Sequence, residues 1–373
     1  MKTRGMTAIN ENKPHRGTGC GGLAIMPVLL LLAAAPVMSQ VDTISGGKNN
    51  VYHDDHSLFS GEEMLDVTLS LDLARFTKKP SKTDTFDADI TIRFSETDSL
   101  ARPVTIKYRG ISRYAICSFP PMQLNFRKPV TIDSVKVRKL KLVTHCQAST
   151  INDEYVIREY LVYKLYNALT DTSFRVRLLK ISYVDSKMNK RTIRKYGIFI
   201  EPSDILAKRI NAVPIKTGII YQSHIIPSVM DRVAIFNYLV SNWDWSIPGQ
   251  HNVQVFKPLE YSNEGNSIAV PYDFDLTGVV NADYAIPPPA MEIENVRQPV
   301  FNGMCRTRDV YQQDLNKFAG AKDSLYSLVN GFPHLSQRAK KDILTFLDNF
   351  YDQLRKQKST DYLIDAFLST CKR

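Results

Sequence analysis

The sequence predicts an α+β fold of two lobes, in which a β-rich first half precedes a helix-rich second half. Residues 64–145 alternate apolar and polar side chains with a period of two, as the strands of an antiparallel sheet do. Residues 151–169 change to a helical period, and most segments after residue 203 also have it. We therefore expect a β-rich N-lobe over residues 64–202 with one main helix, and a helical C-lobe over residues 203–373.

The amino-terminal segment of this 373-residue chain is typical of an export signal. A basic and polar stretch precedes the apolar run LAIMPVLLLLAAAPVM, which is shorter than the roughly 20 residues that a membrane-spanning helix needs. Val37 and Ser39 occupy the two positions that a signal peptidase reads. We expect residues 1–39 to be a cleaved signal peptide and residues 40–63 a flexible lead. The mature protein is then periplasmic or extracellular and has no membrane span.

The charge pattern argues against a nucleic-acid partner. The net charge is +10, but basic residues are interleaved with acidic ones and are not gathered in one run. This pattern is typical of a solvated surface, so no nucleic-acid partner is expected.

Four cysteines follow the expected cleavage site, an even number that permits two disulfides in an exported protein. The sequence does not choose among the three possible connectivities of Cys117, Cys146, Cys305 and Cys371. The pair of Cys117 with Cys146 is favoured because each lies beside a predicted strand of the same lobe.

Stretches of alternating residues, separated by turn residues, are expected to be the strands of the N-lobe. They cover residues 64–76, 86–94, 102–110, 122–128, 137–145, 174–185 and 193–201. Before the last two of these, Ile157, Leu161 and Leu165 recur every fourth residue. Residues 151–169 are therefore expected to form a helix, with Asn152 as its N-cap.

The C-lobe is expected to consist of helices and one hairpin. A helix over residues 228–243 precedes two short strands, at residues 252–256 and 268–274. Helices over residues 321–332 and 336–370 complete the chain.

Acidic and amide side chains gather at the ends of that hairpin, where burying a charge is costly unless a cation lies nearby. Asp244 follows the preceding helix, Asn252 begins the first strand, and Asp273 and Asp275 end the second strand. Antiparallel strands joined by a loop bring their outer ends together, so Asn252 and Asp273 are expected to be neighbours. Carboxylate and amide oxygens are ligands of magnesium and manganese, which complete their shell with phosphate oxygens and water. A further acid outside that shell can orient a hydroxyl group as a base.

A set of short motifs resembles a known family. The segments RGISRYAICSFPPMQLNF, KLKLVTHC, REYLVYKLYNAL, YGIFIE, NWDWSIPGQHN and PYDFDLTG occur in this order. Together they resemble the CotH kinase-like family, in particular its exported bacterial members, from about residue 64 to residue 310. The resemblance implies an atypical, bilobal protein-kinase-like fold. It also implies binding of ATP with Mg²⁺ or Mn²⁺ and transfer of phosphate to a protein or another exported polymer.

The resemblance also implies roles for single residues around the hairpin. Asp244 takes the place of the catalytic-loop aspartate. Asn252 and Asp273 take the places of the two metal ligands, and Asp275 supports the metal site.

Further roles fall on the N-lobe. Lys141 is the counterpart of the strand lysine on the nucleotide phosphates, and Glu159 is its helix partner. Lys139 competes with Lys141 for its role, and Glu154 competes with Glu159. The backbone around Glu201 is the counterpart of the hinge that contacts adenine.

The chain departs from ordinary protein kinases in two ways. Asp244 and Asn252 are eight positions apart, whereas kinases separate this pair by about five. Either the segment SIPGQH bulges or Asn252 is not the ligand. A G-x-G-x-x-G loop is missing, and the first lobe offers Gly110 instead, with Arg109 and Arg113 as candidates for direct phosphate contacts.

Two classes of function remain open at this stage. The first is an exported, metal- and ATP-dependent phosphotransferase, favoured by the presence of all the candidate acids. The second is a non-catalytic binding or assembly protein, a pseudokinase-like scaffold in which the acids hold a structural cation or a ligand. The missing glycine loop and the scarcity of ATP outside the cytoplasm favour the second.

Overall fold

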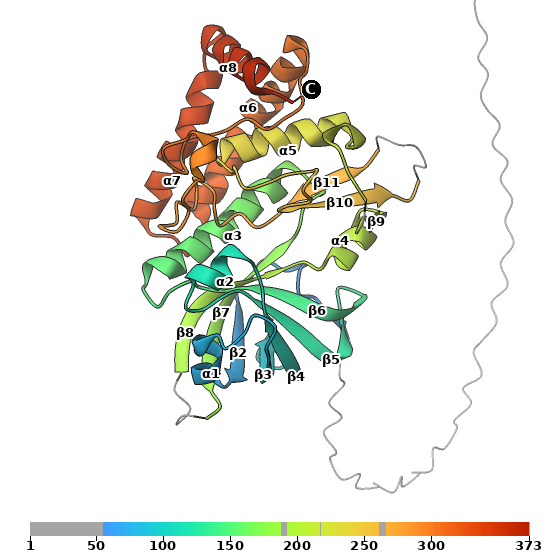
Figure 1. The fold of residues 1–373 in the computed structure, drawn as a ribbon, viewed down its shortest axis with the longest axis vertical. Helices are drawn as coiled ribbons and strands as arrows, with labels where there is room; N and C mark the ends of the chain where they lie inside the picture. The colour runs from blue at the N-terminus through green and yellow to red at the C-terminus, as the bar shows by residue number, and fades with distance from the viewer. Residues whose placement is uncertain (1–54, 188–191, 217, 261–265, 373) are drawn as a thin grey trace, which may run out of the picture. The chain divides into compact units, whose positions relative to one another are not determined.

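Strands of alternating apolar and polar residues form a closed β-barrel in the structure, a computed structural model that describes residues 55–187, 192–216, 218–260 and 266–372 (Figure 1). In the first of these strands Leu65, Val67 and Leu69 are buried, whereas Asp66 and Thr68 are exposed, so every second side chain enters the barrel. The barrel strands are β2 (Leu65–Leu71), β3 (Thr85–Arg93), β4 (Ser99–Tyr108), β5 (Met122–Ile132), β6 (Val135–Val143), β7 (Val176–Asp185) and β8 (Thr192–Ile200).

The barrel closes because its two end strands pair with each other. The strand order is β5-β4-β3-β2-β7-β8-β6, and β6 pairs again with β5. Leu142 of β6 lies opposite Phe199 of β8 on one side and opposite Met122 of β5 on the other. Neighbouring strands are antiparallel except β2 and β7, which are parallel. A short strand, β1 (Asp55–His56), pairs in parallel with the end of β5.

This closure contradicts the fold class expected from the sequence. The described residues form a closed seven-stranded barrel with helices, so the prediction of an α+β, bilobal, atypical protein-kinase-like fold with a β-rich N-lobe and a helix-rich C-lobe is wrong. Alternation marks the two faces of a strand but carries no information on which strand edges pair. Closure depends on pairing between β6 and β8, distant in sequence, and on a register shift in β5 between Asn125 and Val130.

Two apolar cores meet at strands β7 and β8. Leu179 and Ile181 of β7 belong to the core that fills the barrel. Leu178 of β7 and Ile198 of β8 belong instead to the core formed with the helices. These strands are therefore covered on both faces, which joins the barrel to the rest of the described chain.

The helices are α1 (Leu73–Lys78), α2 (Ser112–Ile116), α3 (Ile151–Leu169), α4 (Ser203–Arg209), α5 (Pro227–Leu239), α6 (Arg308–Gly331), α7 (Gln337–Tyr351) and α8 (Gln357–Thr370), with 3₁₀ turns η1 (Gln222–His224), η2 (Pro289–Met291) and η3 (Asp352–Leu354). Helix α3 contacts β7, β8 and α6, and Figure 1 draws it between the barrel and the later helices. The N-cap of α3 is Thr150 and not Asn152. The Asn152 Oδ1 accepts a hydrogen bond from the backbone N–H of Gln147, before the helix, and so does not cap an N–H of the first turn. The prediction of Asn152 as the N-cap was therefore wrong.

A second, antiparallel sheet has the order β11-β10-β9, formed by β9 (Ala212–Pro214), β10 (Val253–Pro258) and β11 (Ile268–Pro271). Val253 of β10 lies opposite Pro271 of β11. This register places the residue before β10 beside the residues that follow β11, as the hairpin prediction required.

Both disulfides are formed between described residues. Cys117 is bonded to Cys146, which confirms the favoured pair, and Cys305 is bonded to Cys371. Within the described ranges no helix combines the length and apolar character that crossing a membrane requires. The predicted signal peptide, residues 1–39, and residues 40–54 of the predicted lead lie outside the described residues.

Candidate functional site

Asp244 is held by a polar network at the end of α5. The helix ends where Ser241 adopts a φ of 50°, a left-handed conformation, and the Ser241 hydroxyl donates to the backbone oxygen of Val296. The backbone N–H of Asn242 donates to the Asn237 oxygen at 2.7 Å, and the Asn242 Oδ1 accepts from the backbone N–H of Asp244 at 3.0 Å. Asn237 and Asn242 are buried, so this network fixes the backbone that carries Asp244.

A closed turn brings His251 and Asn252 back to Asp244. Ser246 and His251 exchange two backbone hydrogen bonds of 3.0 Å. His251 Nε2 then lies 2.8 Å from Asp244 Oδ1. Asn252 Nδ2 donates to the backbone oxygen of Asp244 at 2.7 Å and to its Oδ2 at 2.9 Å. The segment SIPGQH therefore bulges, and this bulge accounts for the long spacing between Asp244 and Asn252.

Asp273 lies beside Asn252 at the end of the hairpin. The backbone N–H of Tyr272 donates to the Asn252 oxygen at 2.9 Å. Asn252 and Asp273 have φ values of 53° and 64°, a left-handed conformation that is uncommon outside glycine and clusters at functional sites. The backbone N–H of Asp273 donates to the Tyr163 hydroxyl of α3 at 2.8 Å, which ties the hairpin to that helix.

A buried arginine supplies the positive charge next to these acids. Arg113 of α2 is 5% exposed, and its Nη2 donates to the backbone oxygen of Thr144. Its Nε lies 3.7 Å from Asp275 Oδ2, and its Nη1 lies 3.8 Å from Glu159 Oε2. Both contacts are ion pairs but exceed hydrogen-bond length, so Arg113 Nε and Nη1 and Asp275 Oδ2 have no hydrogen-bond partner among the described residues.

These side chains meet at one cavity of about 220 Å³. The predicted site residues that line it are Arg109, Arg113, Asp244, Asn252, Asp273 and Asp275. Gly110, with a φ of 76°, and His251 also line it. Cationic side chains from α2 and the loop before it therefore line the same cavity as carboxylates from the α5–β10 loop and from the segment after β11.

Lys141 lies next to this cavity and Lys139 does not. The Lys141 ammonium is 4.6 Å from the ring centre of Tyr272, a residue that lines the cavity. Burial and the nearby Arg109 guanidinium lower the pKa of Lys141 to about 8. Lys139 is exposed, so the geometry favours Lys141 for contact with a ligand.

The buried acids bind protons more tightly than free carboxylates. Burial and the neighbouring Asp273 carboxylate raise the pKa of Asp275 to about 7, although Arg113 opposes the shift. Burial and the nearby Asp275 also raise the pKa of Glu159 well above its usual range. One guanidinium therefore does not compensate all the negative charge gathered here.

Three predicted residues lie elsewhere or have other partners. Glu159 pairs with Arg113, and among the described ion pairs none joins it to Lys141. Glu154 is 2.8 Å from Arg158 and does not reach the cavity. Glu201 is buried, accepts from Arg209 at 2.8 Å and from the backbone N–H of Arg175 at 3.0 Å, and does not line the cavity.

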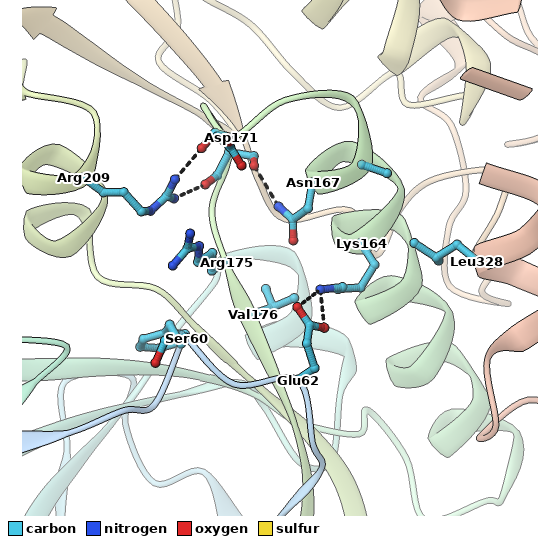
Figure 2. Close-up of a pocket in the computed structure, with 12 residues that line it drawn as sticks. Ser60, Glu62, Lys164, Asn167, Asp171, Arg175, Val176, Arg209 and Leu328 are labelled. Atoms are coloured by element: carbon cyan, nitrogen blue, oxygen red, sulfur yellow. Dashed lines mark hydrogen bonds and ion pairs between the residues drawn. The ribbon is translucent and has the colours of Figure 1, made fainter. Parts of the chain in front are cut away.

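Figure 2 shows a separate cavity of about 340 Å³ near Arg209. Two of its cations already have partners: Lys164 Nζ is 2.6 Å from Glu62 Oε1, and Arg209 donates to the backbone oxygens of Asp171 and Ser173. Lys164 and Arg209 are therefore engaged by short contacts, in contrast to Arg113 at the cavity with Asp244.

No group of three or more His, Cys, Asp or Glu side chains among the described residues could hold a metal ion. The predicted ligand set consists of two carboxylates, Asp273 and Asp275, and the amide of Asn252. That amide presents its nitrogen to Asp244, since both atoms it contacts there are acceptors.

His251 was not among the predicted site residues, but its ring hydrogen-bonds Asp244 and lines the cavity, with the side chain 54% exposed. Sequence reasoning also missed the contact of Tyr163 with the Asp273 backbone. Asp244 and His251 are only seven positions apart in the sequence, which makes a contact between them possible. The backbone pairing of Ser246 with His251 is what brings the two side chains together.

Comparison with known proteins adds little to this geometry. No family model and no curated protein matches the sequence. Among solved structures, the chain is similar to the Helicobacter pylori proinflammatory kinase CtkA, at 11% identity and a TM-score of 0.35, over 74% of this chain and 90% of that chain. A kinase is thus a structural neighbour, but at this TM-score the likeness carries no argument about fold or activity.

Proposed function

We propose that the protein is an exported phosphotransferase that uses ATP with Mg²⁺ or Mn²⁺ and transfers phosphate to a protein or another exported polymer. One observation carries the proposal: a single cavity has Arg109 and Arg113 on one side and Asp244, Asn252 and Asp273 on the other. Phosphoryl transfer depends mainly on positioning and on electrostatic stabilisation of phosphate oxygens, and this set of groups suits both tasks.

The cationic side of the cavity would hold the phosphates. Arg109 lines the cavity and can present a planar fork of N–H donors to phosphate oxygens. Burial and the nearby Arg109 guanidinium together lower the pKa of Lys141. A phosphate bound between the two cations would offset their repulsion, so binding should raise the pKa of Lys141.

The acidic side fits a divalent cation that arrives with phosphate ligands. Asp275 Oδ2 is buried without a hydrogen-bond partner among the described residues, and Asp273 and Asp244 add negative charge around it. Mg²⁺ usually takes one or two protein carboxylates and completes its shell with water and substrate phosphates, so two carboxylates suffice. A cation held by Asp273 and Asp275 would neutralise charge on the transferring phosphoryl group.

Asp244 is the proposed general base. Its carboxylate is oriented by His251 and Asn252, and it remains 23% exposed at the cavity. An acceptor hydroxyl that hydrogen-bonds Asp244 would pass its proton to this carboxylate as its oxygen bonds to the γ-phosphorus of ATP, while the bond from that phosphorus to the bridging oxygen breaks and ADP leaves. The rigid turn that carries Asp244 suits this role, because a general base must keep its position relative to the substrate to within a fraction of an ångström.

Export is part of the proposal and rests on two kinds of evidence. The first is the sequence pattern of residues 1–39. The second is the pair of disulfides, which are typical of proteins in oxidising compartments.

A non-catalytic binding protein is the second candidate, and a specific observation favours it. Arg113 already provides an internal countercharge for Asp275 and Glu159. A scaffold could therefore keep these acids without a metal. The two candidates differ in whether the cavity binds nucleotide and whether phosphate is transferred.

Thermal melting with and without Mn²⁺ and ATP tests the first difference, because a ligand that binds the folded form raises its apparent stability. We expect a rise in Tm for the unmodified protein and for Asp244→Asn. We expect no rise for Asp273→Asn, because it weakens the cation site. The absence of any rise at millimolar nucleotide would favour the scaffold.

Intact-mass measurement after incubation with Mn²⁺, ATP and a general acceptor such as casein tests the second difference. Loss of the base should lower the transfer rate by about 10²–10⁴-fold in Asp244→Asn. Asp314→Asn, which alters an acid paired with Lys317 outside the cavity, is the matched control and should transfer normally. Equal rates in both variants would rule out Asp244 as the base.

A further inference from the structure

Helix α2 carries Arg113 into the acidic cluster but has little apolar anchoring of its own. It consists of five described residues, and Arg113 is the one among them that is buried. Ile116 is 46% exposed, and Ile111, directly before the helix, is 81% exposed. No described side chain caps its first turn. A single helical turn is unstable by itself, so α2 depends on contacts with the rest of the protein.

The location of the Arg113 guanidinium is costly. It is buried, and its carboxylate partners Asp275 and Glu159 lie 3.7 and 3.8 Å away. Close and complete contacts are needed to offset the removal of charges from water, and these contacts are neither. The one hydrogen bond of this guanidinium to the described residues goes to the backbone oxygen of Thr144. The position of Arg113 therefore depends on how firmly the backbone of α2 is held.

The Cys117–Cys146 disulfide joins the two segments that this hydrogen bond connects. Cys117 is the C-cap of α2, one turn after Arg113, and Cys146 follows Thr144 by two positions. Both cysteines are buried. Next to the disulfide, the backbone N–H of Phe119 donates to the Cys146 oxygen at 3.1 Å, and the Thr144 hydroxyl donates to the Phe119 oxygen at 3.0 Å. The disulfide thus fixes α2 to the segment that binds the guanidinium.

The other contacts of the C-terminal end of α2 are hydrogen bonds at its surface. Lys79 Nζ donates to the backbone oxygens of Tyr114 and Cys117 at 2.9 and 3.1 Å. Gln147 Nε2 donates to the Ile116 oxygen at 2.8 Å. Water competes for partly or fully exposed hydrogen bonds, so each contributes little. The disulfide is buried and covalent, and it is the strongest of the described contacts of this end of the helix.

We propose that the Cys117–Cys146 disulfide completes the candidate site by holding Arg113 in the acidic cluster. When the two cysteines are free thiols, α2 is released from the segment before α3. The guanidinium then leaves Asp275 and Glu159 without their countercharge. It also leaves the cationic side of the cavity, which weakens the binding of phosphate groups. This consequence rests on the proposed function, whereas the placement of Arg113 does not.

The disulfide forms by thiol–disulfide exchange with a low-molecular-weight or protein disulfide. The thiolate of one cysteine attacks that disulfide, forms a mixed disulfide and releases one thiol. The thiolate of the other cysteine attacks the mixed disulfide and releases the second thiol. Two electrons and two protons pass to the oxidant in total. Oxidising compartments outside the cytoplasm supply such disulfides, so completion of the site would accompany the proposed export.

A double-mutant cycle tests the placement of Arg113 without nucleotide or metal. In the full, oxidised protein at pH 8, Arg113→Met should lower the folding equilibrium constant at least about 100-fold in urea unfolding. In Cys117→Ala/Cys146→Ala it should lower it less than about tenfold, because the guanidinium has already left the cluster. In the matched control Cys305→Ala/Cys371→Ala, which removes the other disulfide, the large loss should remain. Equal losses in the two cysteine variants would overturn the proposal.

A redox equilibrium tests the same coupling with all cysteines present, so it does not require the cysteine variants to fold. By linkage, Arg113 in the cluster favours the disulfide as much as the disulfide favours Arg113. Alkylation and mass mapping in glutathione buffers measure each disulfide separately. The equilibrium constant for reduction of Cys117–Cys146 should be at least about tenfold higher in Arg113→Met than in Arg158→Met, with the other disulfide unchanged. Equal constants in the two arginine variants would contradict the coupling.

Thermal melting with Mn²⁺ and increasing ATP tests the consequence for the site. The apparent dissociation constant for ATP should be at least about tenfold higher in Cys117→Ala/Cys146→Ala than in the unmodified protein, and unchanged in Cys305→Ala/Cys371→Ala. Equal constants in the two cysteine variants would overturn the link to phosphate binding. The absence of any ATP effect on the three proteins would overturn the proposed function instead, and the double-mutant cycle would still decide the placement of Arg113.

Discussion

Two buried arginines, Arg158 of α3 and Arg113 of α2, have very different surroundings. Arg158 is 7% exposed and binds Glu154 at 2.8 Å, Asp342 at 2.7 Å and the backbone oxygen of Val279 at 3.1 Å. Arg113 is 5% exposed, but its carboxylate partners lie 3.7 and 3.8 Å away and two of its nitrogens have no hydrogen bond to the described residues.

The difference separates a structural ion cluster from a site prepared for a ligand. Short, complete contacts around Arg158 connect α3 to α7 and leave little polar capacity for anything else. Around Arg113 the carboxylates keep unpaired oxygens beside a cavity, and their pKa values rise because burial and like charges disfavour ionisation. Perturbed buried acids in a cleft mark a functional site more reliably than the number of charges does.

The largest expected effect comes from removing each arginine. Arg113→Met leaves Glu159 and Asp275 buried without a countercharge, so we expect a loss of about 3–5 kcal/mol in the free energy of unfolding at pH 8. Arg158→Met should cost less, about 1–2 kcal/mol, because Glu154 and Asp342 are 30% and 35% exposed and can be solvated. Urea unfolding of both variants at pH 8 measures this ranking.

The pH dependence sharpens the same test. At pH 6 the loss in Arg113→Met should shrink, since Glu159 and Asp275 can take up protons and then need no countercharge. A loss in Arg158→Met equal to or greater than that in Arg113→Met at pH 8 would contradict the distinction between the two clusters.

An intermediate effect is expected for Asp275→Asn. The pKa of Asp275 is raised from 3.8 to about 7 by burial and Asp273, so the folded protein binds this proton more tightly than the unfolded chain. Stability from this group is complete below pH 4 and is lost as the pH rises towards 7. Asp275→Asn should therefore be about 2 kcal/mol more stable than the unmodified protein at pH 8 but not at pH 4.

Urea unfolding of Asp275→Asn at pH 4 and pH 8 measures this effect. Glu154→Gln is the matched control, because Glu154 lies in the Arg158 cluster and should show no gain at pH 8. An Asp275→Asn variant that is less stable than the unmodified protein at pH 8 would show that Arg113 fully compensates the carboxylate.

The smallest effect is expected for Asp342→Asn, with the opposite sign. Partial burial raises the pKa of Asp342, but hydrogen bonds from Arg297 and Arg158 outweigh this and lower it below its ordinary value. Its contribution is present above the ordinary carboxyl pKa and is lost as the pH falls through the lowered value. Because the side chain is 35% exposed, the loss at pH 7 should stay below about 1 kcal/mol. A gain in stability at pH 7, measured by urea unfolding, would contradict the pKa direction.

Much of the local structure and half of the site could be predicted from the sequence. The alternation in β2 and the helical period in α3 reflect side-chain burial along one element, which neighbouring residues determine. The meeting of Asn252 with Asp273 followed from hairpin geometry, since a short loop fixes which strand ends are adjacent.

Contacts between distant segments could not be predicted. The Lys141 and Glu159 pair was an expectation from family resemblance, but the partner of Glu159 is Arg113, 46 positions away and on another helix. The position of Glu201 at the end of the strand that is now β8 could be predicted from the sequence. Its ion pair with Arg209 could not, because that contact depends on how α4 packs.

By itself, the sequence determined the strands, the helices and the set of acids near the hairpin, because side-chain periodicity and turn residues act over a few positions. Only the tertiary structure decided that the strands close into a barrel and that Arg113 enters the acidic cluster. Both outcomes depend on hydrogen bonds and charges between segments far apart in the chain, and local patterns do not encode which distant edges and charges will meet.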